Sequence, residues 1–357
     1  MNILLQLSHP AHYHLFKHTV ADLMAHGHEV HILIKTKDVL EELLQSSELP
    51  YRNILPHAHR KSRLGILWDM LVRDWCIWKY VHRHHIDLLM GSTCEVAQVG
   101  WLTRRYRLNF GEDDAHVVPL YFKLIRPFAQ CLLAPVSCNN GDLESRTVHY
   151  RGYHKLAYLH PNRFTPDRKV VARYFDPDEP YFLIRFAQLT AHHDSGIHGF
   201  STDVAQQLID RLTPHGRVFI TSERPLEPQF EQYRLKIAPA DIHHVMAFAR
   251  MYIGDSQSMA VEAAMLGVPG IRFNDFAGRI GVLEELEHTY RLTVGIASSQ
   301  PERLLAQVDT WLADPELQDT FAARRRQMLA DKIDVTAFFT WFIEHYPESR
   351  HTPWTSQ

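Results

Sequence analysis

The sequence has few of the features that mark secreted, membrane-spanning or nucleic-acid-binding proteins. It has only 4 cysteines, and none forms a C-x-x-C pair, so a disulfide framework is not indicated and a reduced cytoplasmic setting fits best. No apolar run reaches the roughly 18 residues that a membrane-spanning helix needs. The opening MNILLQLSHPAHYH has no basic leader, so we expect neither a signal peptide nor a membrane anchor. Lys and Arg number 38 against 41 Asp and Glu, which leaves no basic excess for binding nucleic acid.

What is present is the composition of a folded protein with two domains. Hydrophobic residues make up 45% and charged residues 22% of the 357 residues, far from the signature of disorder. At roughly 150 residues per domain, two compact domains are expected. Histidine is unusually frequent, with 25 residues, but the count alone does not specify a metal site.

Apolar runs alternate with amphipathic segments along both halves of the chain, which predicts parallel sheets covered by helices. Near the start, an apolar run at 2–8 precedes an amphipathic stretch at 14–26. Gly27 ends that stretch, and a second apolar run follows at 29–35. This order is typical of a strand–helix–strand unit with a right-handed crossover. The same signals predict helices at 37–45, 64–84 and 95–106 and a strand at 86–91.

The alternation breaks between residues 146 and 180, where tyrosine, glycine and proline interrupt it, as an interdomain connection would. It restarts with strands at 181–186, 217–222, 251–254 and 270–273 and helices at 201–212, 242–249, 258–266, 301–313, 315–332 and 335–346. We therefore predict domains at 1–155 and 181–334, a connection at 156–180, and a helix and tail at 335–357. Two doubly wound α/β domains bind ligands at the carboxyl ends of their strands, and the cleft between them is the expected site.

The strongest local signal is a strand followed directly by a helix of small residues, GDSQSMAVEAAMLGVP, from Gly254 to Pro269. Ser256 or Ser258 can cap this helix, whose free N–H groups and positive dipole end attract phosphate. Glu262 lies one helical turn after Ser258, where a carboxylate can accept hydrogen bonds from ribose hydroxyls. The alternative is an ordinary capped helix with a surface glutamate.

This helix resembles the donor-nucleotide motif of GT-B glycosyltransferases and of the related UDP-N-acetylglucosamine 2-epimerases. More narrowly, the chain resembles DUF354, an uncharacterised family of GT-B-like proteins. The resemblance implies two Rossmann-like domains facing each other across a cleft. It also implies a nucleotide-diphosphate sugar, most simply a UDP-sugar, with its phosphates on helix N-termini and its ribose on Glu262. The segments that carry the resemblance are SHPAHYHLFK from Ser8, GHEV from Gly27, AHHD from Ala191, TSER from Thr221 and the helix after Gly254.

Two groups in the N-terminal domain can supply acid–base chemistry. His9 and His12 occupy the first strand-to-helix turn, where a histidine can act as a base or bind phosphate. In the superfamily this loop is usually rich in glycine, and the histidines here favour side-chain chemistry. Glu112, Asp113 and Asp114 follow a further strand expected at 107–110, and crowded carboxylates raise one another's pKa. We predict that His12, Asp113 or Asp114 deprotonates the acceptor; a solvated acidic loop is the alternative for the carboxylates.

Cationic groups of the C-terminal domain are expected to hold the diphosphate. Arg185, at the end of a predicted strand, offers a permanent charge. The following His192-His193-Asp194 loosely resembles the His-Arg-x-Glu-Asn-x-Gly motif of the epimerases, although the arginine and asparagine are absent. That resemblance implies a catalytic His192 that serves departure of the nucleotide. The expected contacts to the nucleotide-sugar are His9, Arg185, His193, Ser222, Arg224, Ser256, Ser258, Met259 and Glu262.

The remaining histidines do not predict a metal or cofactor. His14 and His18 have the helical spacing of two ligands, but the glutamate of a zincin and a local third ligand are absent. The groups at 82–85 and at 243–244 are interpreted as solvated or helix-capping histidines. We therefore expect no metal and no cofactor, with the nucleotide-sugar as substrate.

An amphipathic segment at 60–85 places Trp68, Trp75 and Trp78 along one side, with basic residues at its ends and opposite side. Such a helix can rest on a membrane surface and give access to a lipid-linked acceptor. A second apolar and basic stretch at 121–128 can extend that surface. Burial of the three tryptophans in the core is the alternative.

These signals together predict a metal-independent GT-B glycosyltransferase. It would move a sugar from a nucleotide-diphosphate donor to a saccharide or lipid-linked acceptor, in cell-envelope or polysaccharide synthesis. A cytoplasmic location, with possible contact to the inner face of the membrane, is expected, and no nucleic-acid partner. The alternatives are a hydrolysing UDP-sugar 2-epimerase on the same scaffold and a non-catalytic protein that binds nucleotide-sugars.

Overall fold

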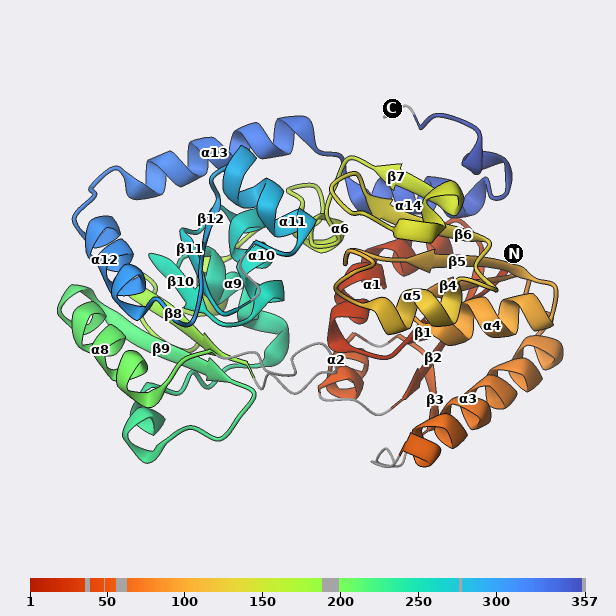
Figure 1. Ribbon diagram of the computed structural model, residues 1–357, viewed down its shortest axis with the longest axis horizontal. Coiled ribbons are helices and arrows are strands. Elements are labelled where there is room, and N and C mark those ends of the chain that lie inside the picture. Colours follow the sequence, from red (N-terminus) through yellow and green to blue (C-terminus); the bar gives the residue numbers. More distant parts are fainter. Residues whose placement is uncertain (36–38, 48, 56–62, 188–198, 276–277, 355–357) are drawn as a thin grey trace. The chain divides into compact units, whose positions relative to one another are not determined.

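The computed structural model describes residues 1–35, 39–47, 49–55, 63–187, 199–275 and 278–354 (Figure 1). They form two compact α/β units. Unit 1 comprises Met1–Tyr158 and Ile333–Gln357, and unit 2 comprises Leu159–Lys332. Within the described residues, none of the helices has the length and hydropathy needed to cross a bilayer.

Unit 1 is built on a parallel sheet of seven strands in the order β3-β2-β1-β4-β5-β6-β7. Its core strands are short, almost fully buried apolar runs, as a sheet covered on both faces requires. The chain leaves β1 toward β2 and β3 on one side, and β4 lies on the other side of β1. The order of strands therefore reverses between β1 and β4, where ligands bind in doubly wound sheets. The strands are β1 (Asn2–Leu7), β2 (Glu29–Lys35), β3 (Tyr51–Leu55), β4 (Leu88–Gly91), β5 (Tyr106–Phe110), β6 (Cys131–Pro135) and β7 (Thr147–Tyr150).

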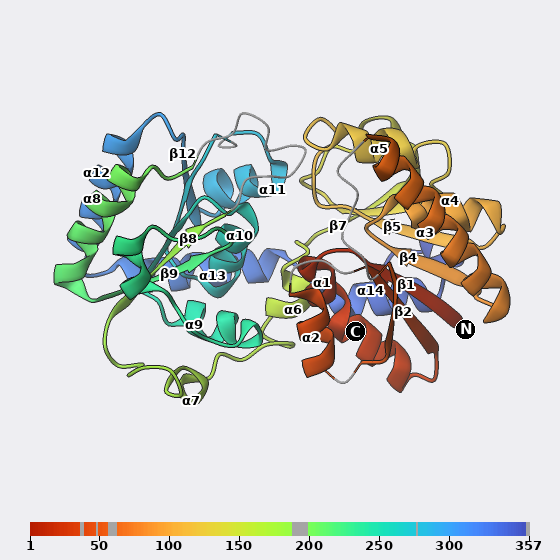
Figure 2. The ribbon, with the colours of Figure 1, turned by 90° about the horizontal axis from the view of Figure 1, so that it is seen from below.

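Helices cover both faces of this sheet (Figure 2). One layer contains α1 (Pro10–Ala25), α2 (Leu40–Ser46) and α14 (Val335–Glu344). The other contains α3 (Arg63–Arg83), α4 (Cys94–Leu102) and α5 (Pro119–Ile125). The start predicted for α1 was four residues too late, because His9 caps the helix and Pro10 suits its first turn.

The C-terminal helix α14 belongs to unit 1, whereas the sequence pattern left it outside both domains. Its aromatic side enters the core of that unit. The ring of Phe339 lies 4.8 Å from that of Phe110, which in turn lies 4.8 Å from Phe16 of α1. Thr336 also donates a hydrogen bond of 2.6 Å to the carbonyl of Ala157. Edge-to-face rings of this kind add to the stabilisation from burial.

Unit 2 has a parallel sheet of five strands in the order β12-β11-β10-β8-β9. Its order reverses between β8 and β10. The strands are β8 (Tyr181–Phe186), β9 (Arg217–Ser222), β10 (Met251–Gly254), β11 (Gly270–Phe273) and β12 (Thr293–Ile296). The helices are α7 (Arg168–Val171), α8 (Thr202–Leu212), α9 (Ile242–Ala247), α10 (Gln257–Leu266), α11 (Gly281–Glu284), α12 (Pro301–Leu312) and α13 (Leu317–Asp331), while α6 (Leu156–Leu159) spans the boundary of the two units.

The sequence pattern did not identify β3, β6, β7 or β12. Each has only four or five residues, and β3 and β7 contain polar or charged residues in place of the continuous apolar run that marked β4. β7 also lies in the stretch that appeared irregular in the sequence. Its parallel pairing with β6 comes from contacts that are distant in the chain.

Candidate functional site

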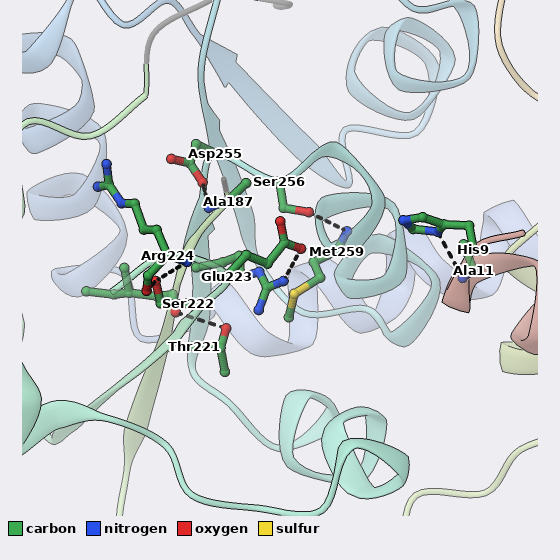
Figure 3. Close-up of polar contacts among 12 residues, drawn as sticks. His9, Ala11, Ala187, Thr221, Ser222, Glu223, Arg224, Asp255, Ser256 and Met259 are labelled. Carbon is green, nitrogen blue, oxygen red and sulfur yellow. Dashed lines mark hydrogen bonds and ion pairs between the residues drawn. The ribbon is translucent and has the colours of Figure 1, made fainter. Parts of the chain in front are cut away.

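In unit 2, the chain segments that follow β8 and β10 are joined at the point where the strand order reverses. Asp255 follows β10 directly, and its carboxylate accepts a hydrogen bond of 2.6 Å from the backbone of Ala187, just after β8 (Figure 3). Asn274 donates a bond of 2.9 Å to the carbonyl of Asp255. Burial raises the pKa of Asp255 to about 6, although these backbone contacts act in the opposite direction. Asp255 therefore holds the two loops together at the carboxyl edge of the sheet.

Helix α10 begins at this same edge. Ser256 is its N-cap, and its hydroxyl accepts a bond of 3.5 Å from the backbone N–H of Met259. Ser258 is exposed and lies in the first turn, and Met259 is buried. Of the two serines that the sequence offered as caps, the structure uses Ser256. Its cap leaves the N–H groups of the first turn and the positive end of the helix near the β8–β10 junction, an arrangement suited to an anion.

Two arginines extend the positive charge along the same edge. Arg185, near the end of β8, forms an ion pair with the half-exposed carboxylate of Glu223. Arg224 follows β9 and lies over the ring of Phe186 at 5.1 Å. Within the described residues, the Nε atoms of both arginines are buried and have no hydrogen-bond partner. No described residue therefore satisfies the Nε donor of either guanidinium, and both arginines supply permanent positive charge to this edge of the sheet.

Ser222 shapes the loop that carries Arg224. Its hydroxyl donates a bond of 2.7 Å to the carbonyl of Arg224 and accepts one of 3.2 Å from the Arg224 N–H. This small turn fixes the backbone directly after β9. Ser222 thus positions the arginine, and its hydroxyl is occupied within the chain.

Glu262 lies on the buried side of α10, one turn and a half from the N-cap. Only 8% of the residue is exposed, and its carboxylate lies 3.3 Å from Nε2 of His243 on α9. The prediction that His243 is solvated or caps a helix was wrong, because 3% of it is exposed. The contact between the carboxylate and the imidazole offsets part of the cost of burying both polar groups. The surface-glutamate alternative for Glu262 is excluded.

In unit 1, the point where the strand order reverses is crowded at the backbone. Gly91, the last residue of β4, has φ +147°, and a Cβ there would lie 2.7 Å from the carbonyl oxygen of Gln6 in β1. Thr93 donates a bond of 2.5 Å to the Gln6 side chain. These contacts fix the carboxyl ends of β1 and β4, which are followed by His9 and α1 on one side and by α4 on the other.

His9 and His12 lie in the first turn after β1, as the sequence placed them. His9 is exposed and accepts a bond of 3.2 Å from the N–H of Ala11 (Figure 3). His12 Nδ1 accepts a bond of 3.3 Å from the N–H of Ser8, so the proton of its neutral ring is on Nε2. Burial lowers the pKa of His12 to about 3, and the nearby His9, His154 and Lys35 act in the same direction. At neutral pH His12 is therefore an uncharged hydrogen-bond donor.

Glu112, directly after β5, is the centre of a cluster of buried polar groups. Its carboxylate accepts a bond of 2.5 Å from the His154 backbone N–H and forms an ion pair with Lys155. Burial would raise the pKa of Glu112, but Lys155 and His154 hold it below its ordinary value. Cys138 donates a bond of 3.0 Å to the Glu112 carbonyl. The cluster ties the segments that follow β5, β6 and β7 to one another.

His154 and Lys155 were not identified from the sequence. They lie four and five residues after the end of β7, and the available signal was that a strand ending at Tyr150 would bring them to the same edge as Glu112. Burial lowers the pKa of His154 to about 4, despite the neighbouring Glu112. Among the described residues, its Nε2 is buried and has no hydrogen-bond partner.

The two neighbouring aspartates have different surroundings. Asp114 is buried, and its carboxylate accepts a bond of 2.7 Å from the N–H of Asn139. Its carboxylate therefore helps to hold the loop after β6. Asp113 is exposed on the same loop as Glu112. Of the predicted carboxylates, Asp113 is the one exposed to solvent.

The predicted residues His192, His193 and Asp194 lie outside the described residues. Within the part of the chain that is described, one group of side chains brings metal-ligating atoms within 4.8 Å, namely Glu284, Glu287 and His288. Arg272, which is fully buried, already pairs with Glu287 at 2.8 Å. This group is therefore a charge-compensated cluster.

Comparison with known proteins identifies solved structures that share this architecture. No protein-family model matches the chain, so the DUF354 resemblance has no support from that source, and no curated protein matches its sequence. Solved structures do match. A UDP-GlcNAc 2-epimerase from Neisseria meningitidis, bound to UDP-GlcNAc, has a TM-score of 0.69 at 11% identity and covers 96% of this chain and 100% of its own. MnaA from S. aureus with UDP has a TM-score of 0.70 at 11% identity, with 100% of both chains covered.

Glycosyltransferases match over nearly the same length. The spinosyn rhamnosyltransferase SpnG, in complex with spinosyn aglycone, has a TM-score of 0.61 at 14% identity and covers 96% of this chain and 100% of its own. The chain therefore has the two-sheet α/β fold of GT-B glycosyltransferases and of UDP-GlcNAc 2-epimerases, as predicted. At these identities the comparison establishes the fold.

Proposed function

We propose that the protein is a GT-B glycosyltransferase that uses a nucleotide-diphosphate sugar, with a UDP-sugar as the first candidate. The observation that carries this proposal is the carboxyl edge of the unit 2 sheet. There the N-terminus of α10 follows β10, Arg185 lies near the end of β8 and Arg224 follows β9, so that positive charge gathers at the ends of three adjoining strands. Fixed dipoles and guanidinium groups at such an edge suit a diphosphate.

The same groups would stabilise the leaving nucleotide. As the bond between the sugar and the diphosphate breaks, negative charge develops on the leaving oxygen. The α10 N-terminus and the two arginines are placed before the reaction, which is the condition for efficient stabilisation of such charge. Glu223, half-exposed in its pair with Arg185, can be displaced by phosphate. We infer that this reaction needs no divalent cation, because these groups supply the positive charge.

Asp113 is our candidate for the base that deprotonates the acceptor. His12 and Asp114 were equal candidates from the sequence, but a ring with a pKa of about 3 accepts a proton poorly near neutral pH, and Asp114 is buried against Asn139. The Nε2–H of His12 would instead donate a hydrogen bond to a substrate oxygen. The acceptor would be a saccharide or a lipid-linked saccharide of envelope or polysaccharide synthesis.

Single replacements test this assignment. Asp113→Asn should lower turnover by about a hundredfold or more, the lower limit typical of a general base, while nucleotide binding is retained. Glu302→Gln, an exposed carboxylate at the start of α12, is the matched control. Turnover would be followed as nucleotide release from donor sugars in the presence of an acceptor panel. Full activity of Asp113→Asn would refute its role.

A UDP-sugar 2-epimerase is the second candidate, and one observation favours it. The TM-scores to the epimerases, 0.69 and 0.70, exceed the 0.61 of the rhamnosyltransferase. Incubation with UDP-GlcNAc and no acceptor distinguishes the two. Free UDP together with N-acetylmannosamine would establish epimerisation, whereas a transferase should leave the donor nearly intact until an acceptor is added.

A further inference from the structure

The outer helical layer of unit 1 exposes a stripe of large apolar side chains. On α3, Trp68, Leu71 and Trp75 are each 56% exposed and Trp78 is 37% exposed. Their spacing of three or four residues places them along one side of the helix. The opposite side of α3 is buried through residues such as Ile77. Burial of these tryptophans in the core, the alternative left open by the sequence, is therefore wrong.

The next helix of the same layer also exposes large apolar side chains. α4 packs beside α3, and both helices run from the carboxyl edge to the amino edge of the same sheet (Figure 2). The last turn of α4 exposes Trp101 and Leu102, at 53% and 59%. Monomeric proteins rarely expose so many large apolar side chains on one helical layer without a binding partner. We name this surface, with its residues on α3 and α4, the tryptophan face.

A basic hollow adjoins the α4 end of the tryptophan face. It has a volume of about 520 Å³ and is lined by Trp101 and by Arg104, Arg105 and Arg107. Arg107 is used within the chain, where its Nε donates a bond of 2.6 Å to the Phe128 carbonyl. Arg104 is exposed and Arg105 is half-buried. The hollow therefore presents guanidinium groups beside an exposed indole.

Charges on α3 have the same sign at the surface. Lys79 lies 3.6 Å from the centre of the Trp75 ring, and Arg83 is exposed in the last turn. Neither of the two aspartates on this helix is exposed. Asp69 is buried, and burial together with Glu95 raises the pKa of Asp74 to about 7. The exposed side of α3 thus combines indoles with cations.

We propose that the tryptophan face docks on the surface of an anionic lipid bilayer. Indole rings prefer the boundary between lipid headgroups and acyl chains, and the flanking lysine and arginines would contact headgroup phosphates. A second copy of the chain fits less well, because a symmetric interface would bring the same cations face to face. This binding is independent of the proposed donor site, since it requires neither nucleotide nor turnover.

Vesicle co-sedimentation tests the proposal directly. The full chain should pellet with vesicles of phosphatidylcholine and phosphatidylglycerol and bind vesicles of phosphatidylcholine alone much more weakly. Replacing Trp68, Trp75 and Trp78 together by alanine should weaken binding by about tenfold or more, because interfacial binding scales with buried apolar area. Met24→Ala, an exposed apolar residue of α1, is the matched control and should bind as the wild type does.

Charge reversal provides a second variant that leaves the tryptophans in place. Lys79→Glu with Arg83→Glu should weaken binding to the anionic vesicles and remove the preference for them. Arg303→Glu with Arg326→Glu makes the same change of charge in unit 2 and should have little effect. The proposal is overturned if the wild type does not bind anionic vesicles, or if the tryptophan variant binds them equally. It is also overturned if sedimentation shows a dimer that the tryptophan replacements dissociate while vesicle binding is absent.

Discussion

Acidification should destabilise unit 1 through His154. Burial holds the pKa of this ring at about 4 in the folded protein, against an ordinary value of 6.5. Above that ordinary value both the folded and the unfolded states are neutral, so His154 contributes no pH dependence there. As the pH falls from 6.5 toward 4, His154 becomes protonated in the unfolded chain but stays mostly neutral in the folded chain. The free energy of unfolding therefore falls with pH in this window.

The size of the effect follows from the pKa difference. Each pKa unit corresponds to about 1.4 kcal/mol, so the loss approaches roughly 3 kcal/mol at pH 4 and is about 2 kcal/mol at pH 5. His154→Gln removes the titrating ring. Between neutral pH and about pH 5 this variant should lose about 2 kcal/mol less stability than the wild type does. His12, whose pKa is also lowered, adds a further loss in both proteins, which is smaller in the variant because His154 helps to lower the pKa of His12.

Urea unfolding at the two pH values measures this difference. Tryptophan fluorescence reports mainly on unit 1, which contains every tryptophan except Trp311, and circular dichroism reports on both units. His82→Gln, an exposed histidine of α3, is the control and should follow the wild type. Equal acid losses in the wild type and in His154→Gln would refute the reasoning. A ring pKa near 6.5 in an NMR titration of His154 would refute it as well.

Two further replacements test the contacts that hold the carboxyl edge of the unit 1 sheet. Lys155→Met leaves Glu112 buried without its cation and should cost about 3 to 5 kcal/mol; thermal unfolding should show this loss, and adding Glu112→Gln should restore part of it. Gly91→Ala places a methyl group against the carbonyl of Gln6 at φ +147° and should cost about 1 to 3 kcal/mol. Gly111→Ala is the control and should be nearly neutral, because a Cβ there would make an ordinary contact of 3.5 Å. Equal losses of stability for Gly91→Ala and Gly111→Ala would contradict the inference that β1 and β4 approach too closely at Gly91 for a side chain.

The features that the sequence predicted correctly are those determined by nearby residues. The alternation of strands and helices comes from local periodicity, and the cap at Ser256 depends on residues within one turn of α10. The position of Arg185 at the carboxyl edge of its sheet required only that β8 be recognised as a strand. Such features predicted the doubly wound class of both units.

The features that the sequence did not predict depend on contacts between segments that are distant in the chain. The cluster of Glu112, His154 and Lys155 exists because β7 pairs with β6, and the four residues of β7 include no continuous apolar run by which a buried strand is recognised. The pair formed by Glu262 and His243 requires that α9 pack beside α10. An amphipathic pattern shows that a helix has two sides, but not which one the rest of the fold covers.

Binding of UDP, measured by calorimetry, tests the central claim most directly, namely that a diphosphate binds at the carboxyl edge of the unit 2 sheet. The wild type should bind UDP, and Arg185→Gln should bind it about tenfold or more weakly, a difference of about 1.4 kcal/mol. Arg217→Gln, which removes an equal charge from the opposite end of the neighbouring strand, should bind UDP as the wild type does. Equal affinities for Arg185→Gln and Arg217→Gln, or no binding of UDP, GDP, CMP or dTDP to the wild type, would contradict the claim.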